Sequence, residues 1–257
     1  MPFDVGGNIW NGAMAKVQNS RSIITRGLVL HLDAGAPGSY PGSGTTWSDL
    51  SGNGNNSTLE ESTMGTVSAS LQTIAFKGSG DESNNSEYVT LPLADLKDYT
   101  KGSIEFFWKI YSTGYVSPFI MTMSDGSPDN IWAVGVTGAN YRIVHENGGS
   151  TVTNLNASVS AIALGKHFHL VFTSDSSTNN IYHDGAKQTV TVAAGSNNGT
   201  WFDDAPSPTT MEIGHYRRSY TSHPMEGEIP ICRIYDRALT GKEVLQNFNA
   251  NKSRFGI

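Results

Sequence analysis

The sequence has little cysteine and few basic residues, and both shortages exclude classes of function. Cys232 is the one cysteine among 257 residues, so no intrachain disulfide can form. Its neighbours Ile231 and Ile234 indicate a small buried hydrophobic side chain rather than a nucleophile. Lysine and arginine total 17 against 23 acidic residues, which gives a net charge of −6. Nucleic-acid binding requires clustered basic side chains and is therefore not expected.

Long hydrophobic runs are also missing. The first ten residues, MPFDVGGNIW, lack the basic flank and the apolar stretch of a signal peptide, and no run reaches the length that crosses a membrane. Charged residues make up only 16% of the chain, whereas 28 residues are glycine. This composition is typical of short strands and turns. We expect no signal peptide, no membrane insertion and little helix.

Alternating side chains predict an all-β fold. Leu28–Leu32 alternates in the two-residue period of a strand. Ser103–Ile110 does the same, with Ile104, Phe106 and Trp108 on the face that we expect in the core. Asp184-Gly185 predicts a tight hairpin turn. The same reasoning predicts strands at Ile131–Val136, Tyr141–His145, His167–Thr173, Asn180–His183, Gln188–Val192, Met211–Gly214 and Glu228–Tyr235.

The first predicted strand leads into a loop rich in asparagine and glycine. Asp49, Asn53 and Asn55, with Asp33 as a further contributor, form a cluster of oxygen ligands that suits calcium. The same residue types also stabilise turns, because their side chains accept hydrogen bonds from nearby backbone N–H groups. Both interpretations, a calcium site and a set of turn-stabilising hydrogen bonds, remain open at this point.

Both ends of the chain resemble a known family. Gly27–Thr58 reads GLVLHLDAGAPGSYPGSGTTWSDLSGNGNNST and is similar to the opening of LamG-like, concanavalin A-like jelly-roll domains of tailed-bacteriophage virion proteins, those of marine, cyanophage-like phages in particular. Ile234–Thr240 and Glu243–Asn249 resemble the end of the same domains, and Lys166–Phe172 and Ile181–Gly185 resemble paired strands of the wider family. The resemblance implies a jelly-roll β-sandwich of two antiparallel sheets.

The chain divides into an N-terminal arm, residues 1–22, and a LamG-like domain, residues 23–257. Phe3, Ile9 and Trp10 give the arm apolar anchors for attachment to a neighbour, and a disordered tail is the alternative. The domain ends in a short helix at about 241–250, where Thr240 caps the helix and Glu243 completes a capping box. Val244, Leu245 and Phe248 form its expected docking stripe.

Catalytic and zinc patterns are weak. Jelly-roll retaining hydrolases place three acids on one strand as E-x-D-x-x-E, and Glu226-Gly227-Glu228 lacks the third acid. His167 and His169 share one strand face at zinc-ligand spacing, but no third ligand accompanies them, and an exposed or groove-facing surface is the alternative. We therefore expect no enzyme, with a glycoside hydrolase or polysaccharide lyase using the jelly-roll groove as the alternative.

Two loops carry the aromatic and polar residues that bind glycans or protein partners. Sugars bury their C–H faces on aromatic rings and form hydrogen bonds at their edges. One loop contributes Trp201, Asp203 and Asp204. The other loop contributes Tyr216, Arg217 and Tyr220. The same residue types anchor protein interfaces, so the sequence does not separate the two kinds of partner.

The resemblance implies a structural protein of the virion, either a capsid decoration or a tail-fibre component. Such a protein is made in the host cytoplasm, released by lysis, and displays its lectin-like domain for adsorption to host or environmental glycans. Its expected partners are other virion proteins and a cell-surface glycan. A homo-oligomer is expected, with a closed trimer as the first arrangement to test.

Overall fold

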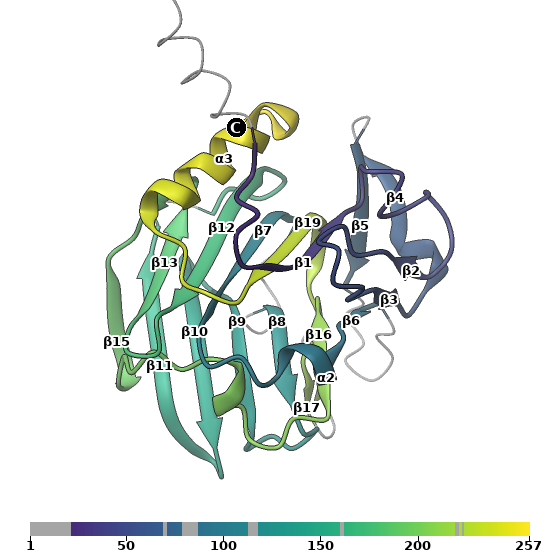
Figure 1. Ribbon diagram of the computed structural model, residues 1–257. Helices are drawn as coiled ribbons and strands as arrows, with labels where there is room; N and C mark the ends of the chain where they lie inside the picture. The colour runs from purple at the N-terminus through teal and green to yellow at the C-terminus, as the bar shows by residue number, and fades with distance from the viewer. Residues whose placement is uncertain are drawn as a thin grey trace, which may run out of the picture.

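Two antiparallel sheets pack face to face in this computed structural model (Figure 1). The structure describes residues 22–68, 71–78, 87–112, 118–159, 162–218, 221–222 and 224–257. Residues 1–21, with the arm anchors Phe3, Ile9 and Trp10, lie outside this description, so the arm and its boundary at residue 22 stay predictions. The all-β jelly-roll sandwich with one C-terminal helix is confirmed.

The first sheet, called sheet A, contains the strand at Leu28 and the central pair of long strands. Its order is β14 (Ala186–Lys187), β13 (Asn179–His183), β12 (His167–Ser174), β7 (Gly102–Ile110), β19 (Glu226–Tyr235), β5 (Leu71–Lys77) and β4 (Gly65–Ser68), with β1 (Leu28–Asp33) also paired to β19.

The second sheet, called sheet B, runs from the edge strand after the predicted hairpin to two short strands near the N-terminus. Its order is β15 (Val190–Gly195), β11 (Ser150–Ser158), β10 (Asn140–Asn147), β9 (Ile131–Thr137), β8 (Phe119–Ser124), β16 (Thr210–Ile213), β6 (Val89–Thr90), β3 (Ser57–Leu59) and β2 (Thr46–Trp47). The remaining short elements are the hairpin β17 (Arg217–Arg218) and β18 (Thr221–Ser222), the helix α2 (Leu93–Leu96) and the 3-10 turns η1 (Ser62–Met64) and η2 (Phe202–Asp204).

The core lies between the two sheets, and β7 is buried on both of its faces. Ile104, Phe106 and Trp108 are fully buried in the core, as predicted. The opposite face of β7 is buried as well, because α3 (Gly241–Phe255) packs across sheet A, with Phe107 stacked on Phe255 at 4.7 Å. Cys232 is also buried, as its apolar neighbours indicated, and burial raises the pKa of its thiol.

Helix α3 begins as predicted and ends later. Thr240 Oγ1 accepts from the Glu243 N–H at 3.4 Å, and the Glu243 carboxylate accepts from the Thr240 N–H at 2.8 Å, which completes the capping box. The helix continues to Phe255 instead of about residue 250 and ends at Gly256 in the left-handed region, with φ of 69°. Leu245 was placed in the docking stripe, but it is 46% exposed. The predicted Val244 is buried and the predicted Phe248 contacts the His169 ring at 5.5 Å, while Asn247 and Phe255 complete the buried side of the helix.

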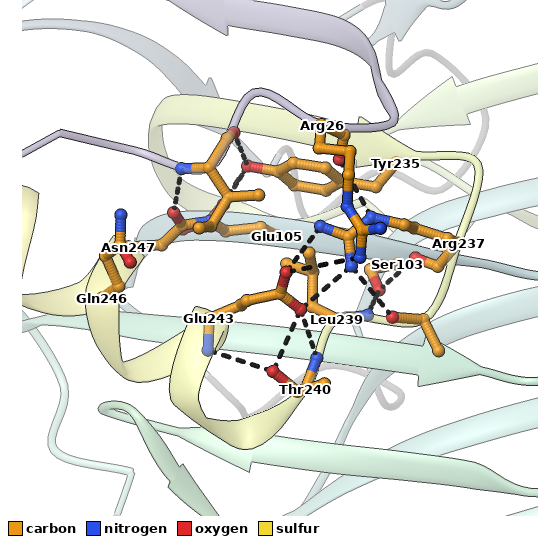
Figure 2. Close-up of polar contacts among 12 residues, drawn as sticks. Arg26, Ser103, Glu105, Tyr235, Arg237, Leu239, Thr240, Glu243, Gln246 and Asn247 are labelled. Atoms are coloured by element: carbon orange, nitrogen blue, oxygen red, sulfur yellow. Dashed lines mark hydrogen bonds and ion pairs between the residues drawn. The ribbon is translucent and has the colours of Figure 1, made fainter.

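A buried polar network joins α3 to sheet A around the carboxylate of Glu105 (Figure 2). Glu105 accepts hydrogen bonds from Asn247 Nδ2 at 2.8 Å and Arg233 Nη1 at 3.3 Å. The ring Nε2 of His169 lies 2.8 Å from the same carboxylate. Burial opposes ionisation of Glu105, but Arg233, His169 and Asn247 outweigh that effect and lower its pKa to about 2. Glu105 therefore stays charged at neutral pH inside the fold.

The same network ties the first described residues to the C-terminal helix (Figure 2). The Ile24 N–H donates to Asn247 Oδ1 at 2.7 Å, and the hydroxyl of Tyr235 donates to the Ile24 carbonyl at 3.2 Å. Gln246 Nε2 donates to the Ser22 carbonyl at 2.9 Å. The two ends of the described chain consequently lie side by side on sheet A. The described residues include no helix that is long and apolar enough to cross a membrane.

Buried histidines predict a loss of stability in mild acid. Burial, with the charge of Arg233, lowers the pKa of His31 from 6.5 to about 4. Burial also lowers the pKa of His145, His167 and His183. A histidine of the unfolded chain binds its proton near pH 6.5, so acid favours the unfolded chain, and stability should decrease as the pH falls from about 6.5 towards 4. Thermal melts between pH 7.5 and 4 test this. The drop should be smaller in His31→Gln, and an equal drop in both proteins would contradict the assignment to His31.

Candidate functional site

The face of sheet B that points away from the core carries an unusual group of polar side chains. On β10, Tyr141 and Ile143 point into the core, so Arg142 between them points outward. Asn156 of β11 pairs with Arg142, and residues directly opposite each other in antiparallel strands lie on the same face. Asn154, two residues earlier on β11, shares that face. We call Arg142, Asn154 and Asn156 the polar triplet.

Every member of the polar triplet has a buried atom without a hydrogen-bond partner. These atoms are Arg142 Nε, Asn154 Oδ1 and Asn156 Oδ1. Within the described part of the chain, Arg142 also forms no ion pair. Buried polar atoms in folded proteins almost always have partners, because an unpaired one loses its hydration without compensation. Three such atoms lie on neighbouring residues of one sheet face, which makes this face the candidate binding site.

An aromatic wall stands beside the polar triplet. The guanidinium carbon of Arg142 lies 5.3 Å from the centroid of the Phe119 ring. Tyr216 meets Phe119 edge to face, with ring centroids 5.3 Å apart, and both rings belong to a buried cluster with Ile131 and Val144. The wall fixes the guanidinium plane, since cations are held over aromatic faces.

The triplet and its wall suit a ligand with a carboxylate and several hydroxyl groups. A guanidinium donates two parallel hydrogen bonds to a carboxylate, and amide side chains both donate and accept. Burial lowers the pKa of Arg142 while the charge of Glu146 acts in the opposite direction. A guanidinium still carries its charge at neutral pH. The site therefore presents one fixed cation, two amides and an aromatic edge.

The first predicted contact loop turns its ring inward. Trp201 is fully buried and meets Trp132 at 74° with ring centroids 5.5 Å apart, so the expected exposed Trp201 platform is wrong. The cause is the η2 turn, in which the Trp201 N–H donates to Asp204 Oδ2 at 3.0 Å and the ring packs on Phe202. Asp203 and Asp204 are exposed. Partial desolvation of the Asp203 carboxyl, aided by the charge of Asp204, raises its pKa.

The second predicted contact loop lies at the outer face of sheet B. Tyr216 reaches this face but is only 4% exposed, so its ring supports Phe119 and does not form an open platform. The backbone of Arg217 belongs to β17, and Tyr220 lies outside the described residues. The role of this loop in contacting a ligand or partner stays a prediction, whereas the exposure expected for Tyr216 is wrong.

The residues predicted for calcium form turn-stabilising contacts. Asp49 accepts from the backbone of His31 at 2.8 Å and from Asn55 at 3.1 Å, and Asp33 pairs with Arg254 at 2.7 Å. Asn53 Nδ2 and Asn55 Nδ2 both donate to backbone carbonyls of β1, at 3.1 and 2.7 Å. These hydrogen bonds and the ion pair occupy the oxygen atoms that calcium would use, and calcium binding at these residues stays a prediction. The arrangement matches the turn-stabilising alternative.

The histidine pair and the acidic pair of β19 are also structural. His169 is fully buried against Glu105 beneath α3, so its strand face is neither exposed nor a groove. His167 lies 3.9 Å from Glu228, which pairs with Lys109 at 3.0 Å. A lysine at this distance disfavours a zinc ion. The described residues contain no group of three potential metal-binding His, Cys, Asp or Glu side chains.

Sequence reasoning missed the polar triplet because β11 was not predicted as a strand. The available signal was the alternation of Asn154, Leu155 and Asn156, in which a buried leucine separates two asparagines. Because asparagine is rare in strands, this pattern predicts a loop when composition alone is considered. The alternation of apolar and polar residues is the signal that indicates a strand. Arg142 was inside a predicted strand, but the sequence does not show which strand pairs with it.

Comparison with solved structures finds carbohydrate-related proteins of the same fold. The CBM40 of Ruminococcus gnavus IT-sialidase, bound to α2,3-sialyllactose, is 15% identical, with a TM-score of 0.51, and the match covers 67% of this chain and 91% of that one. Trypanosoma rangeli sialidase with the inhibitor DANA is 17% identical, with a TM-score of 0.59 over 88% of this chain. This chain spans only 33% of the T. rangeli protein. At these identities the likeness establishes the fold alone.

Comparisons of the sequence itself identify a family. A search of curated proteins gives no significant match. The family model described as "Concanavalin A-like lectin/glucanases superfamily" (Laminin_G_3) matches residues 83–245, which is more than half of the chain and includes β7, the polar triplet and the start of α3. The antiparallel sandwich and this match agree, and the protein belongs to the concanavalin A-like lectin/glucanases superfamily.

Proposed function

We propose that this protein is a non-catalytic carbohydrate-binding protein, and that the outer face of sheet B binds a glycan with a carboxylate. The unpartnered buried atoms of the polar triplet carry the proposal. Arg142 would pair with the carboxylate, and Asn154 and Asn156 would bind neighbouring hydroxyls. The buried rings of Phe119 and Tyr216 would hold the Arg142 guanidinium in place for this contact. The net charge of −6 makes a local cation necessary for such a ligand.

Carbohydrate-related structural neighbours support the choice of probe. One neighbour is bound to α2,3-sialyllactose, a glycan with one carboxylate, and lactose is the matched probe without it. Isothermal titration should show binding of sialyllactose and at least tenfold weaker binding of lactose, because a charged hydrogen bond contributes about 1.5–3 kcal/mol. Equal affinities, or no binding of either, would refute an anion-selective glycan site.

The enzyme alternative is tested with the same probe. Sialidases among the structural neighbours keep a glycoside hydrolase in consideration, with a polysaccharide lyase as the related possibility. We expect intact sialyllactose after prolonged incubation, because the sequence lacks the E-x-D-x-x-E pattern of jelly-roll retaining hydrolases. Release of free sialic acid, measured by chromatography, would overturn the non-catalytic assignment.

Display on a tailed-phage virion is the proposed setting of this binding. The resemblance of Gly27–Thr58 and Ile234–Thr240 to virion proteins supports it. In that setting the arm attaches to capsid or tail subunits and the domain binds host or environmental glycans for adsorption. Cryo-electron microscopy of particles that carry this chain should place residues 1–22 against a neighbouring subunit. A protein absent from purified particles would contradict the setting but not the glycan site.

A further inference from the structure

A hollow lies at the side of the sandwich, where the chain crosses from sheet A to sheet B. Its volume is about 430 Å³, within the usual range of small-molecule sites. Its lining residues come from the start of β13, from β14 and the start of β15, and from the segment after β15. The residues that line it are mostly amides and hydroxyls, among them Asn179, Asn180, Lys187, Gln188, Thr189 and Asn197. We call this hollow the edge pocket.

The floor of the edge pocket is held rigidly. Asn197 Oδ1 accepts from the Asn179 N–H at 2.7 Å, and Asn197 Nδ2 donates to the Asn179 carbonyl at 3.1 Å. Asn179 Nδ2 donates to the Thr200 carbonyl at 2.9 Å. The remaining side-chain atom, Asn179 Oδ1, is buried and has no hydrogen-bond partner; the whole residue is only 1% exposed. The floor is therefore fixed by its own hydrogen bonds, and a ligand would meet the more exposed amides and hydroxyls of the rim.

The rim of the edge pocket carries one positive charge. Lys187 is exposed, and no acidic group of the described chain pairs with it. Gln188 Nε2 donates to the Ala186 carbonyl at 2.8 Å, so its Oε1 is left to accept from a ligand. Amides, hydroxyls and one ammonium bind hydroxyl groups together with an anion. The chemistry of the rim thus matches that of the polar triplet.

The strand register places the edge pocket close to the polar triplet. Arg142 pairs with Asn156, and Asn156 pairs with Thr191 of β15, whose hydroxyl donates to the Asn156 carbonyl at 3.2 Å. Thr189, two residues before Thr191, lines the pocket. Two strand spacings and two residues along β15 separate Arg142 from the pocket, which gives roughly 12 Å. A ligand longer than one sugar can span that distance.

We propose that the edge pocket is a second subsite for the same glycan, and that it binds a further anionic sugar unit through Lys187. This inference rests on the proposed function, and it specifies the ligand as an acidic oligosaccharide rather than a single terminal sugar. A chain with one carboxylate per unit can place one carboxylate at Arg142 and another at Lys187.

Titration with two probes tests the second subsite. Trisialic acid carries three carboxylates and 3′-sialyllactose carries one. Wild-type protein should bind trisialic acid at least tenfold more tightly. Lys187→Gln should remove this gain and leave the affinity for 3′-sialyllactose within twofold, whereas Lys166→Gln, an exposed loop lysine, should change neither affinity. Because Lys187 is exposed, unchanged thermal melts should show that the variant is folded.

The possible failures are distinguishable. If wild-type protein binds both probes and Lys187→Gln retains the full gain for trisialic acid, the second subsite is refuted while the outer-face site stands. If Lys187→Gln and Lys166→Gln weaken the binding of both probes equally, the effect comes from general electrostatics and the subsite is again refuted. If neither probe binds wild-type protein, the proposed function itself fails.

Discussion

Glu105→Gln should lower the free energy of unfolding by about 3–5 kcal/mol, the range observed when one partner of a buried ion pair is removed. The variant keeps the shape of the side chain but leaves Arg233 as an uncompensated buried charge, since Arg233 is 1% exposed. It also disturbs the junction between α3 and β7, where Asn247 donates to the carboxylate. Urea unfolding with an unchanged m-value measures the loss.

The decrease of stability at acidic pH should also change in the same variant. The folded-state pKa of Glu105 is about 2, below its ordinary value of 4.5. A depressed pKa contributes stability above about pH 4.5, and that contribution is lost as the pH falls towards 2; the shift corresponds to about 3 kcal/mol. The free energy of unfolding of Glu105→Gln should therefore depend less on pH between 4.5 and 2 than that of the wild-type protein. The other groups that titrate in this range still contribute to both proteins.

Two further variants show whether the ion pair is responsible. Glu61→Gln removes an exposed carboxylate and should change stability by no more than about 0.5 kcal/mol. Arg233→Met combined with Glu105→Leu removes both charges and should cost less than the sum of the two single changes. Additive costs would mean that the two residues contribute independently, which would contradict the coupling described here.

Arg142→Gln should reduce the affinity for sialyllactose at least tenfold and leave folding intact. The charged hydrogen bonds from a guanidinium to a carboxylate contribute about 1.5–3 kcal/mol, and tenfold corresponds to about 1.4 kcal/mol. Stability should not fall, because Arg142 Nε has no partner to lose and no described carboxylate forms an ion pair with it. Titration with sialyllactose and thermal melting of the same sample measure the two effects.

A charge-matched control separates the site from general electrostatics. Arg26→Gln removes the same charge at a position 80% exposed, beside Glu243 and α3 on the other sheet. It should leave the affinity within twofold. Asn154→Ala should weaken binding of both sialyllactose and lactose, because its amide contacts hydroxyls that the two sugars share. If Arg26→Gln weakens binding as much as Arg142→Gln, the polar triplet is not the site.

The sequence was informative wherever the signal was local. The capping box of Thr240 and Glu243 lies within four residues, and the inward face of Ser103–Ile110 follows from a two-residue period. Both were predicted and both are present. Strands β5, β8 and β11 were missed: β8 is buried at every position and so lacks a polar alternation, and β11 alternates through asparagines, which also favour loops. The family resemblance at the two ends supplied the sandwich that these local signals alone leave incomplete.

Long-range packing decided the details that bear on function. Trp201 and Tyr216 were expected on the surface because aromatic residues in polar loops suit ligands, yet both rings are buried against partners distant in sequence, Trp132 and Phe119. Asn247 was not foreseen in the docking stripe of α3, since its partners Glu105 and Ile24 come from 142 and 223 residues away. No pattern within one segment encodes such contacts.

The sequence by itself determined an all-β chain, its major strands, its capped C-terminal helix and its inert buried cysteine, because periodicity, turn chemistry and capping act between near neighbours in the chain. Only the tertiary structure decided which faces stay open. It placed α3 over sheet A, so that His169 and Glu105 became buried structural groups, and it left the outer face of sheet B to Arg142, Asn154 and Asn156. Strand pairing brings these three residues together across a turn, and register is a property of the assembled sheet rather than of any one strand.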